Sequence, residues 1–218
     1  MMKRGNLIFG VGVNDANYIT RIEKVVDGKK KTIWKCPFLV KWVSMLQRCY
    51  YKKYQEGQPT YRGCRVCDEW LTFSNFKKWM EQQEWEGRQL DKDFLVEGNK
   101  IYSPDTCMFI PQKLNNFIVT CGKIKGQYPI GVCYRKKAKD MVNEYSKPYS
   151  CNVRDGTRNK SYISVHSNPE EAHQRYLAEK LKHCNEYISE FKDEHLIVKG
   201  LTRIRDKIQH HILSLIHI

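Results

Sequence analysis

The chain has 218 residues, and its 38 Lys and Arg against 24 Asp and Glu give a formal net charge of +14. A basic excess of this size is the electrostatic footprint of a nucleic-acid-binding protein. No apolar run reaches the roughly 18 residues that a membrane-spanning helix needs, and the first residues lack the apolar core of a secretory signal, so we expect an intracellular protein with no membrane contact.

Two helices are predicted in the first 80 residues. Apolar side chains recur at helical spacing from Leu39 to Tyr50, after Pro37, and again from Phe73 to Met80. Both stripes are typical of helices that pack in a core. Gly87 then ends the second helical segment and releases the chain into a strand.

Nine cysteines are scattered through the chain, and their odd number favours reduced thiols over a disulfide framework. Cys64 and Cys67 form the one pair with the two-residue spacing of a zinc site. A structural zinc site needs four ligands, and no second pair with this spacing follows. We therefore expect thiols packed in the core and do not expect zinc as a cofactor, with Cys64 and Cys67 as the candidate ligands if it binds.

The stretch from Gln89 to Asn116 predicts two short strands that lead into a helix. Alternation along the first strand places Asp91 and Asp93 on one face and Lys92 on the other. Turn residues at 96–99 and 102–105 separate this strand from a short apolar strand at 107–110.

Pro111 suits the first turn of the helix that follows, which carries Asn115 and Asn116. Carboxylate and amide oxygens are the ligands that Mg²⁺ prefers, and it usually keeps several waters and a substrate phosphate as well. Asp91 and Asn115 could supply the protein's share of such a shell. The stretch therefore predicts a site for Mg²⁺ or Mn²⁺, with Asn116 as a further ligand.

These residues resemble the HNH (ββα-metal) endonucleases found in many bacteriophage genomes. The resemblance covers residues 36–118, and the segments that carry it are WVSMLQRCY (42–50), VCDEWL (66–71), LDKD (90–93), GN (98–99), YSPDTC (102–107) and NN (115–116). It implies metal-dependent hydrolysis of DNA phosphodiester bonds in the cytoplasm of a phage-infected bacterial host. It also implies Asp91 and Asn115 as metal ligands, with Asp93 and Asn116 as neighbours able to substitute.

One position departs from that family, whose general base is usually a histidine beside the strand acid. This chain has no histidine before His166. Lys92 could act as the base only if burial favoured its neutral form, and Asp93 could act through a metal-bound water. The candidate catalytic residues are Asp91, Lys92, Asp93 and Asn115, and the alternatives are a DNA-binding protein that does not cut or acids that merely lie near a turn.

A second module follows a linker at residues 121–127. Half of the net charge lies between residues 121 and 160, where ten side chains are basic and three are acidic. Alternating patterns predict strands at 128–134, 149–154 and 162–165. Asn168, Pro169 and Glu171 then mark the start of a helix as its N-cap, N1 and N3 residues.

The segments YPIGV (128–132) and NPEEAHQRYL (168–177) resemble the DNA-binding domain of plant APETALA/ethylene-response factors. The resemblance implies a sheet that enters the major groove of double-stranded DNA, with Arg, Lys and aromatic side chains on bases and phosphates. The predicted DNA-binding residues are Tyr134, Arg135, Lys136, Lys137, Tyr149, Arg154 and Arg158. The alternative is that these basic side chains form only a solvated face, and an RNA partner is compatible with the same charge.

Leu201, Ile204 and Ile208 predict one more amphipathic helix, expected to dock on the sheet module or to contact DNA. The last residues, 213–218, resemble the translation of a sequencing-library adapter and carry no argument. The predicted class is α+β, with an HNH-like unit at 1–120, a DNA-binding domain of three antiparallel strands and a helix at 128–182, and a helical segment at 183–212.

Overall fold

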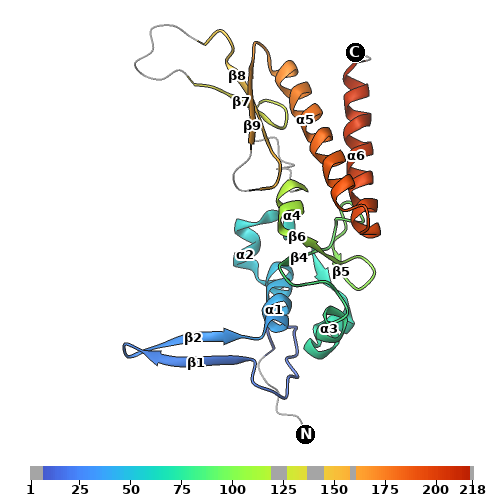
Figure 1. Cartoon of the computed structure of the whole chain (residues 1–218). Coiled ribbons are helices and arrows are strands. Elements are labelled where there is room, and N and C mark those ends of the chain that lie inside the picture. The colour runs from blue at the N-terminus through green and yellow to red at the C-terminus, as the bar shows by residue number, and fades with distance from the viewer. Residues whose placement is uncertain (1–6, 119–126, 137–144, 158–160, 217–218) are drawn as a thin grey trace. The chain divides into compact units, whose positions relative to one another are not determined.

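The computed structural model describes residues 7–118, 127–136, 145–157 and 161–216, and it confirms the α+β class (Figure 1). The chain divides into two compact units, Met1–Ile110 and Pro111–Ile218. The predicted linker at 121–127 lies, apart from Gln127, outside the described residues. None of the helices in the described ranges is long and apolar enough to cross a membrane.

The first unit is built from short strands around two main helices. Its elements are β1 (Arg21–Val26), β2 (Lys29–Lys35), α1 (Pro37–Tyr50), α2 (Lys52–Gly57), β3 (Arg65–Val66), α3 (Phe73–Met80), β4 (Arg88–Asp91), β5 (Ile101–Tyr102) and β6 (Met108–Pro111), with 3₁₀ turns at Pro59–Tyr61 and Asp68–Leu71. Strand β1 pairs with β2, β3 with β5, and β4 with β6. Both predicted helices are confirmed as α1 and α3, although α3 ends well before Gly87.

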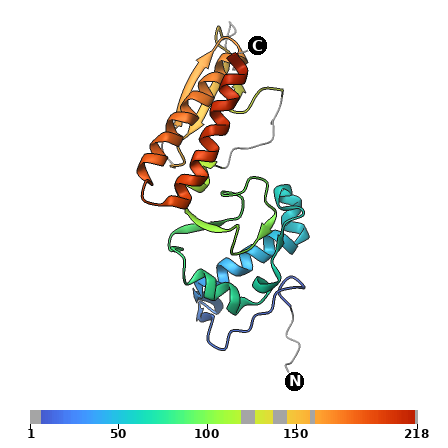
Figure 2. The ribbon, with the colours of Figure 1, turned by 90° about the vertical axis from the view of Figure 1, so that its right-hand side faces the viewer.

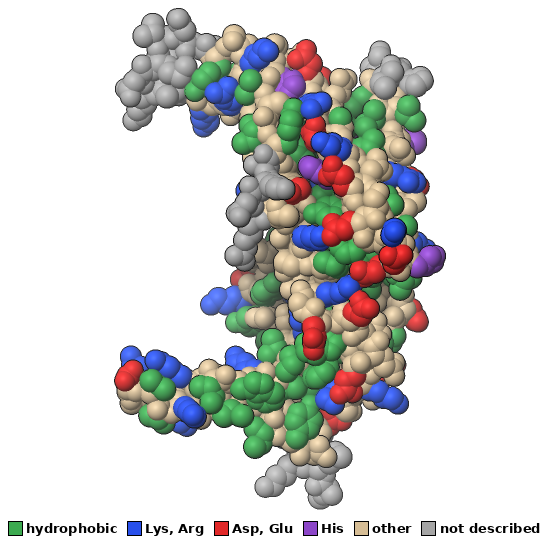
Figure 3. Space-filling model, in the orientation of Figure 1, with side chains coloured by type: hydrophobic (Ala, Val, Ile, Leu, Met, Phe, Trp, Pro, Cys, Tyr) green, Lys and Arg blue, Asp and Glu red, His purple; other side chains and the backbone are tan. Residues whose placement is uncertain are grey.

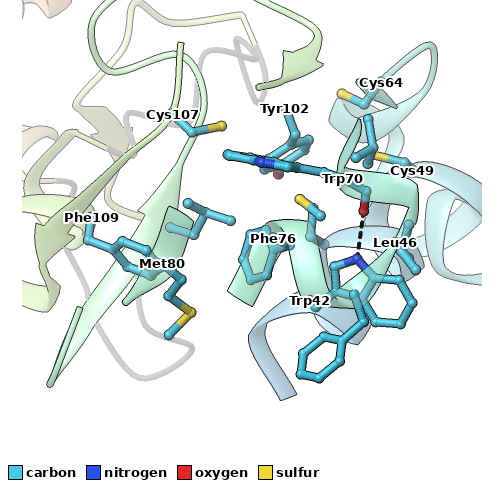
Figure 4. Close-up of a cluster of buried hydrophobic side chains, with 14 of the residues drawn as sticks. Trp42, Leu46, Cys49, Cys64, Trp70, Phe76, Met80, Tyr102, Cys107 and Phe109 are labelled. Carbon is cyan, nitrogen blue, oxygen red and sulfur yellow. Dashed lines mark hydrogen bonds between the residues drawn. The ribbon is translucent and has the colours of Figure 1, made fainter. Parts of the chain in front are cut away.

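An aromatic core holds this unit together (Figure 4). Trp42 of α1 and Trp70 are fully buried. The indole N–H of Trp42 donates to the carbonyl oxygen of Trp70 at 2.7 Å, which gives this buried polar group a partner. Phe76 and Met80 fill the space beside them because the helical spacing of α3 places both on the face turned to α1.

Strands β1 and β2 form an antiparallel hairpin that the sequence patterns above did not predict. Its turn is Asp27-Gly28, and both residues have positive φ, 53° and 71°. This is the geometry of a two-residue type I′ turn, for which Asp-Gly is a favoured sequence. The hairpin projects from the rest of the first unit (Figure 1), and every residue of its strands is exposed.

The second unit is a three-stranded antiparallel sheet backed by two long helices. Its elements are α4 (Gln112–Ile118), β7 (Val132–Tyr134), β8 (Tyr149–Arg154), β9 (Ser161–His166), α5 (Pro169–Glu190) and α6 (His195–Ile216). The sheet order is β7-β8-β9, and α5 and α6 lie side by side (Figures 1 and 2). The strands predicted at 149–154 and 162–165 are confirmed, whereas the strand predicted at 128–134 forms only over Val132–Tyr134. The helix start is confirmed, and the side chain of Asn168 accepts a hydrogen bond from the backbone N–H of Glu171 as an N-cap.

Helix α6 docks on this module, which is one of the two roles expected for it from the sequence. Ile208, Ile212 and Leu215 pack against the core formed by β7, β8 and α5. The helix runs on to Ile216, so residues 213–216 of the segment that resembles an adapter translation belong to it.

Helix α4 belongs to the second unit, whereas the sequence placed it in a domain of residues 1–120. The ammonium group of Lys180 on α5 donates to the carbonyl oxygen of Phe117 and lies over the Phe117 ring. A Cβ on Gly156, in the turn after β8, would stand 2.1 Å from the carbonyl oxygen of Lys113. The short helix is therefore closely packed between α5 and that turn.

Candidate metal centre and nucleic-acid interface

The acidic site in the first unit differs from the predicted strand. Strand β4 ends at Asp91, and the chain turns at once, so the prediction that Asp91 and Asp93 share a strand face is wrong. One carboxylate oxygen of Asp91 accepts the backbone N–H groups of Asp93 and Phe94, at 2.9 and 2.7 Å. The Asp91 side chain thus shapes the turn that brings Asp93 round beside it.

Lys92 is buried in this turn with only 6% of its surface exposed. Its ammonium group donates to a carboxylate oxygen of Asp93 at 3.1 Å and to the carbonyl oxygen of Asn99 at 2.8 Å. The side chain of Asn99 in turn donates to the carbonyl oxygens of Lys92 and Ile101. Lys92 is therefore the ion-pair partner of Asp93 in this turn, with its ammonium group directed at these two acceptors.

Asp91 is the carboxyl of this pair that is perturbed, whereas Asp93 is paired with the ammonium group of Lys92. Burial of Asp91, together with the neighbouring charge of Asp93, raises the pKa of Asp91 to about 6. A divalent cation beside the pair would favour the ionised form of Asp91. The donor set is hard oxygen, as Mg²⁺ and Mn²⁺ prefer.

The pair offers two protein ligands at most. Within the described ranges, no three His, Cys, Asp or Glu side chains gather round one point. Two carboxylates are enough for Mg²⁺ when water and substrate phosphate complete the shell. Asp91 and Asp93 therefore fit a magnesium ion that is bound together with a phosphate ligand.

The amide residues of the predicted metal site lie in the second unit. Asn115 is partly buried on α4. The side chain of Asn116 accepts from Gln112 at 2.8 Å and donates to the carbonyl oxygen of Gly156 at 3.1 Å. Asp91 lies in the first unit. The predicted pair of Asp91 and Asn115 is thus not assembled within one unit, and Asn116 contributes to the packing of α4.

Cys64 and Cys67 do not form a metal site with other described side chains. Burial raises the pKa of both thiols, and it raises the pKa of Cys49 and of Cys107 to about 12. Metal ligation needs the thiolate. Cys49, Cys64 and Cys107 are buried around Tyr102 and Trp70 as free thiols (Figure 4), so packing of the thiols is confirmed for these three.

The sheet of the second unit has one covered face and one open face. Cys151 and Val153 of β8 are fully buried against α5. Tyr149 lies two residues before Cys151 and therefore on the same covered face, and Tyr134 pairs directly with Tyr149. Both tyrosines cluster with Tyr128, at ring distances of 5.3 to 6.1 Å. Tyr134 and Tyr149, two of the predicted DNA-binding residues, therefore lie on the opposite face of the sheet from Arg154.

The open face presents a small set of polar, apolar and basic side chains. They are Cys133, Ser150, Asn152, Arg154, Ile163 and Val165, and none of the described residues on this face is acidic. Arg154 ends the central strand and is exposed. Beyond β7, Arg135 stacks on the ring of Tyr145 at 4.0 Å, and Lys136 is exposed. Lys137 and Arg158 lie outside the described residues.

Comparison with protein-family models, with curated proteins and with solved structures finds no match to this chain.

Sequence patterns missed the β1–β2 hairpin, although its signal is present. Asp27-Gly28 stands between two runs that are rich in Val, Ile and Lys. An Asp-Gly pair between such runs is a strong short-range indication of a hairpin.

Proposed function

We propose that this chain binds double-stranded DNA through the open face of β7–β9 and hydrolyses DNA with a divalent cation held by Asp91 and Asp93. The observation that carries the proposal is the open face itself. A helix-backed antiparallel sheet leaves Arg154 exposed on its central strand, with no acidic side chain on that face among the described residues.

The shape of this surface favours DNA over RNA. The major groove of B-form DNA is wide enough to admit strands, whereas the major groove of A-form RNA is too deep and narrow to be read by side chains. Arginine can pair with phosphate oxygens or with the edge of guanine. Arg154 on the open face and Arg135 beyond the end of β7 supply such groups, and Asn152 lies two residues before Arg154 on the same face.

The cleavage part of the proposal is supported by the carboxylate pair. Asp91 and Asp93 would hold the cation, which would polarise a phosphate oxygen and make bound water more acidic. Lys92 neutralises part of the charge on Asp93 and fixes its position. The pair therefore provides a place for metal-assisted hydrolysis of a phosphodiester.

A DNA-binding protein that does not cut is the second candidate. Two backbone hydrogen bonds to Asp91 give this residue a structural role without any metal. All histidines of the chain lie at or after position 166, so the first unit contains none. Both observations favour a scaffold that binds DNA without hydrolysing it.

Cleavage and binding are tested separately on the same protein preparations. Supercoiled plasmid is incubated with wild type and Asp91→Ala in Mg²⁺, Mn²⁺ or EDTA, and DNA binding is followed by fluorescence anisotropy of a labelled duplex in EDTA. We expect nicking by the wild type with metal, no nicking by Asp91→Ala, and equal DNA affinity for the two proteins. Nicking by Asp91→Ala would refute the metal assignment, and tight binding without nicking in any metal would establish the second candidate.

The sheet is tested by charge reversal at one position. Arg154→Glu is expected to lower DNA affinity at least tenfold, because it replaces an attractive contact by a repulsive one. Lys192→Glu is the matched control, since Lys192 is exposed beyond the opposite end of α5 from Asn168. Equal affinities of the two variants would rule out the open face as the DNA-binding surface.

A further inference from the structure

The hairpin of β1 and β2, residues 21–35, is a charged ribbon in which every strand residue is exposed. It carries six basic side chains and two acidic ones, together with five large apolar ones. Figure 3 shows basic and apolar side chains gathered on this projection, at the lower left. Nothing in the mechanism proposed above uses it.

The strand register sorts these side chains onto two faces, because residues that pair directly across an antiparallel ribbon share a face. The pairs of the first face, here called the lysine face, are Ile22 with Trp34, Lys24 with Lys31 and Val26 with Lys29. The pairs of the opposite face are Arg21 with Lys35, Glu23 with Thr32 and Val25 with Lys30. An irregularity between Ile22 and Glu23 leaves Ile33 unpaired, as in a β-bulge.

Charge is distributed unequally between the two faces. On the opposite face, Arg21 forms an ion pair with Glu23, and Thr32 bridges the two through hydrogen bonds. The lysine face has three lysines and no acidic side chain. Its nearest acid is Asp27 in the turn, 3.9 Å from the ammonium group of Lys31 and 89% exposed, so the contact is weak in solvent.

The lysine face also exposes apolar surface that no described part of the chain covers. Ile22, Val26 and Trp34 are 43%, 37% and 42% exposed. A two-stranded ribbon with both faces in water is marginally stable by itself. Exposed apolar side chains framed by polar ones are typical of a surface that binds a partner.

We propose that the lysine face is a second contact surface for double-stranded DNA. A two-stranded ribbon fits the major groove. Lys24, Lys29 and Lys31 would pair with phosphates along it, and the indole of Trp34 would lie against bases or sugars, as aromatic side chains do in many nucleic-acid sites. The inference rests on the DNA-binding part of the proposed function and is independent of cleavage.

Charge complementarity selects DNA over the other candidate occupants. A second copy of this chain carries the same net charge of +14, so two lysine faces would repel each other. A purely apolar partner would leave three ammonium groups near a dry interface without counter-charges, at a large desolvation cost. DNA supplies regularly spaced phosphates along a groove of matching width.

The test compares two double variants with the same change in charge. Lys24→Glu/Lys31→Glu alters the lysine face, and Lys30→Glu/Lys35→Glu alters the opposite face of the same strands. We expect the first to weaken DNA binding at least tenfold and to bring the slope of log affinity against log salt nearer zero by about 2, for two lost phosphate contacts. We expect the control to change affinity less than threefold. Equal losses in both variants, or none in either, would overturn the assignment of the face.

Trp34 provides a readout that does not depend on charge. Binding of a DNA duplex should reduce acrylamide quenching of tryptophan fluorescence in wild type but not in Trp34→Phe, because the other tryptophans lie elsewhere in the first unit. Equal protection in both proteins would contradict a contact at the lysine face. A matched RNA duplex that competes as well as DNA would overturn the choice of DNA, and a DNA-independent dimer broken by Trp34→Glu would assign the face to a second copy.

Failure of this inference can be told apart from failure of the proposed function. If Arg154→Glu weakens binding and the lysine-face variant does not, the sheet is the DNA-binding surface and the hairpin inference falls. If the lysine-face variant weakens binding and Arg154→Glu does not, the hairpin inference holds and the open sheet face is excluded. A wild-type chain that binds no DNA at low salt would overturn both.

Discussion

At the scale of single residues, the most informative group is the carboxyl of Asp91. One of its oxygens accepts hydrogen bonds from two backbone N–H groups and so stabilises the turn. The ionised form of this carboxyl is nevertheless unfavourable in the folded protein. Burial and the charge of Asp93 raise its pKa from 3.8 to about 6. A carboxyl with a raised pKa is most favourable to the folded state when protonated.

The pH dependence of stability follows from that shift. The favourable contribution of Asp91 is fully present below pH 3.8 and is lost as pH rises through 6, at a cost of about 2 to 3 kcal/mol. In Asp91→Asn the amide oxygen can still accept both backbone hydrogen bonds. Compared with wild type, the variant should therefore gain stability between pH 4 and 8, measured by urea unfolding in EDTA with tryptophan fluorescence. A difference that does not change with pH would contradict the assigned shift.

The proposed metal site leads to a second prediction for Asp91. A divalent cation would relieve the repulsion between Asp91 and Asp93, and binding to the folded state stabilises it by mass action. Addition of Mg²⁺ at about 10 mM should therefore raise the thermal midpoint of the wild-type protein at pH 8 by a few degrees. Asp91→Asn should show a smaller rise, and Asp68→Asn is a control at another acid of the first unit. Equal rises in all three proteins would indicate unspecific ionic effects and no site at the pair.

At the scale of elements, the sequence predicted those helices and strands whose formation depends on residues close together in the chain. The helical stripe of α1, the spacing of α3, and the Asn168-Pro169 start of α5 all depend on neighbours within a few positions. The same holds for β8 and β9 of the second module, whereas β7 covers only the last three residues of the alternating pattern at 128–134.

The features that the sequence did not predict are contacts between residues far apart in the chain and turns of the backbone. Strands β3 and β5 are two residues long and pair in parallel across more than thirty positions, which no alternation pattern can indicate. Asp93 left the predicted strand because the Asp91 side chain binds the next backbone N–H groups and favours a turn. The assignment of α4 to the second unit depends on Lys180 and on Gly156, both far along the chain.

The junction between β7 and α5 allows a prediction about one glycine. Gly131 has φ of +83°, and a Cβ there would stand 2.0 Å from the ring of Tyr176. Gly131→Ala should therefore destabilise the second unit by about 2 to 4 kcal/mol, from backbone strain together with overpacking. Far-UV circular dichroism should show the loss of helix at lower temperature. All five tryptophans lie in the first unit, so their fluorescence transition serves as the internal control. An unchanged helical midpoint would contradict the steric argument.

The contact between α5 and α6 predicts sensitivity to acid. The Nδ1–H of His173 donates to the carbonyl oxygen of Ile130 at 2.9 Å, so its neutral ring has Nε2 free to accept the N–H of His211 at 3.2 Å. Protonation of His173 would turn its Nε2 into a donor, so the hydrogen bond that it accepts from His211 would be lost. Burial, with His211 nearby, lowers the pKa of His173.

Stability linked to His173 is therefore present above pH 6.5 and is lost as pH falls below it. The midpoint of helix loss should drop between pH 7 and 5, and His173→Gln should reduce the drop. His195→Gln is a control at the start of α6. An equal drop in both variants would show that other groups cause the acid sensitivity.

At the scale of the whole molecule, the charge of +14 is a property that both units share. The open sheet face and the lysine face each present Arg or Lys side chains without acids beside them among the described residues. Two surfaces that bind one polyanion add their counterion release, so salt dependence measures how many phosphates the chain neutralises.

Wild type should show a slope of about −5 for log affinity against log salt, if about six phosphates are neutralised. Arg154→Glu should bring this slope nearer zero by about 1 and Lys24→Glu/Lys31→Glu by about 2, since each lost cation releases one counterion fewer. The combined triple variant should change the slope by about 3 if both surfaces bind the same duplex. Anisotropy titrations between 50 and 300 mM KCl give these values directly. A triple variant whose slope equals that of the double variant would mean that the sheet adds no phosphate contact, and the two-surface arrangement would have to be abandoned.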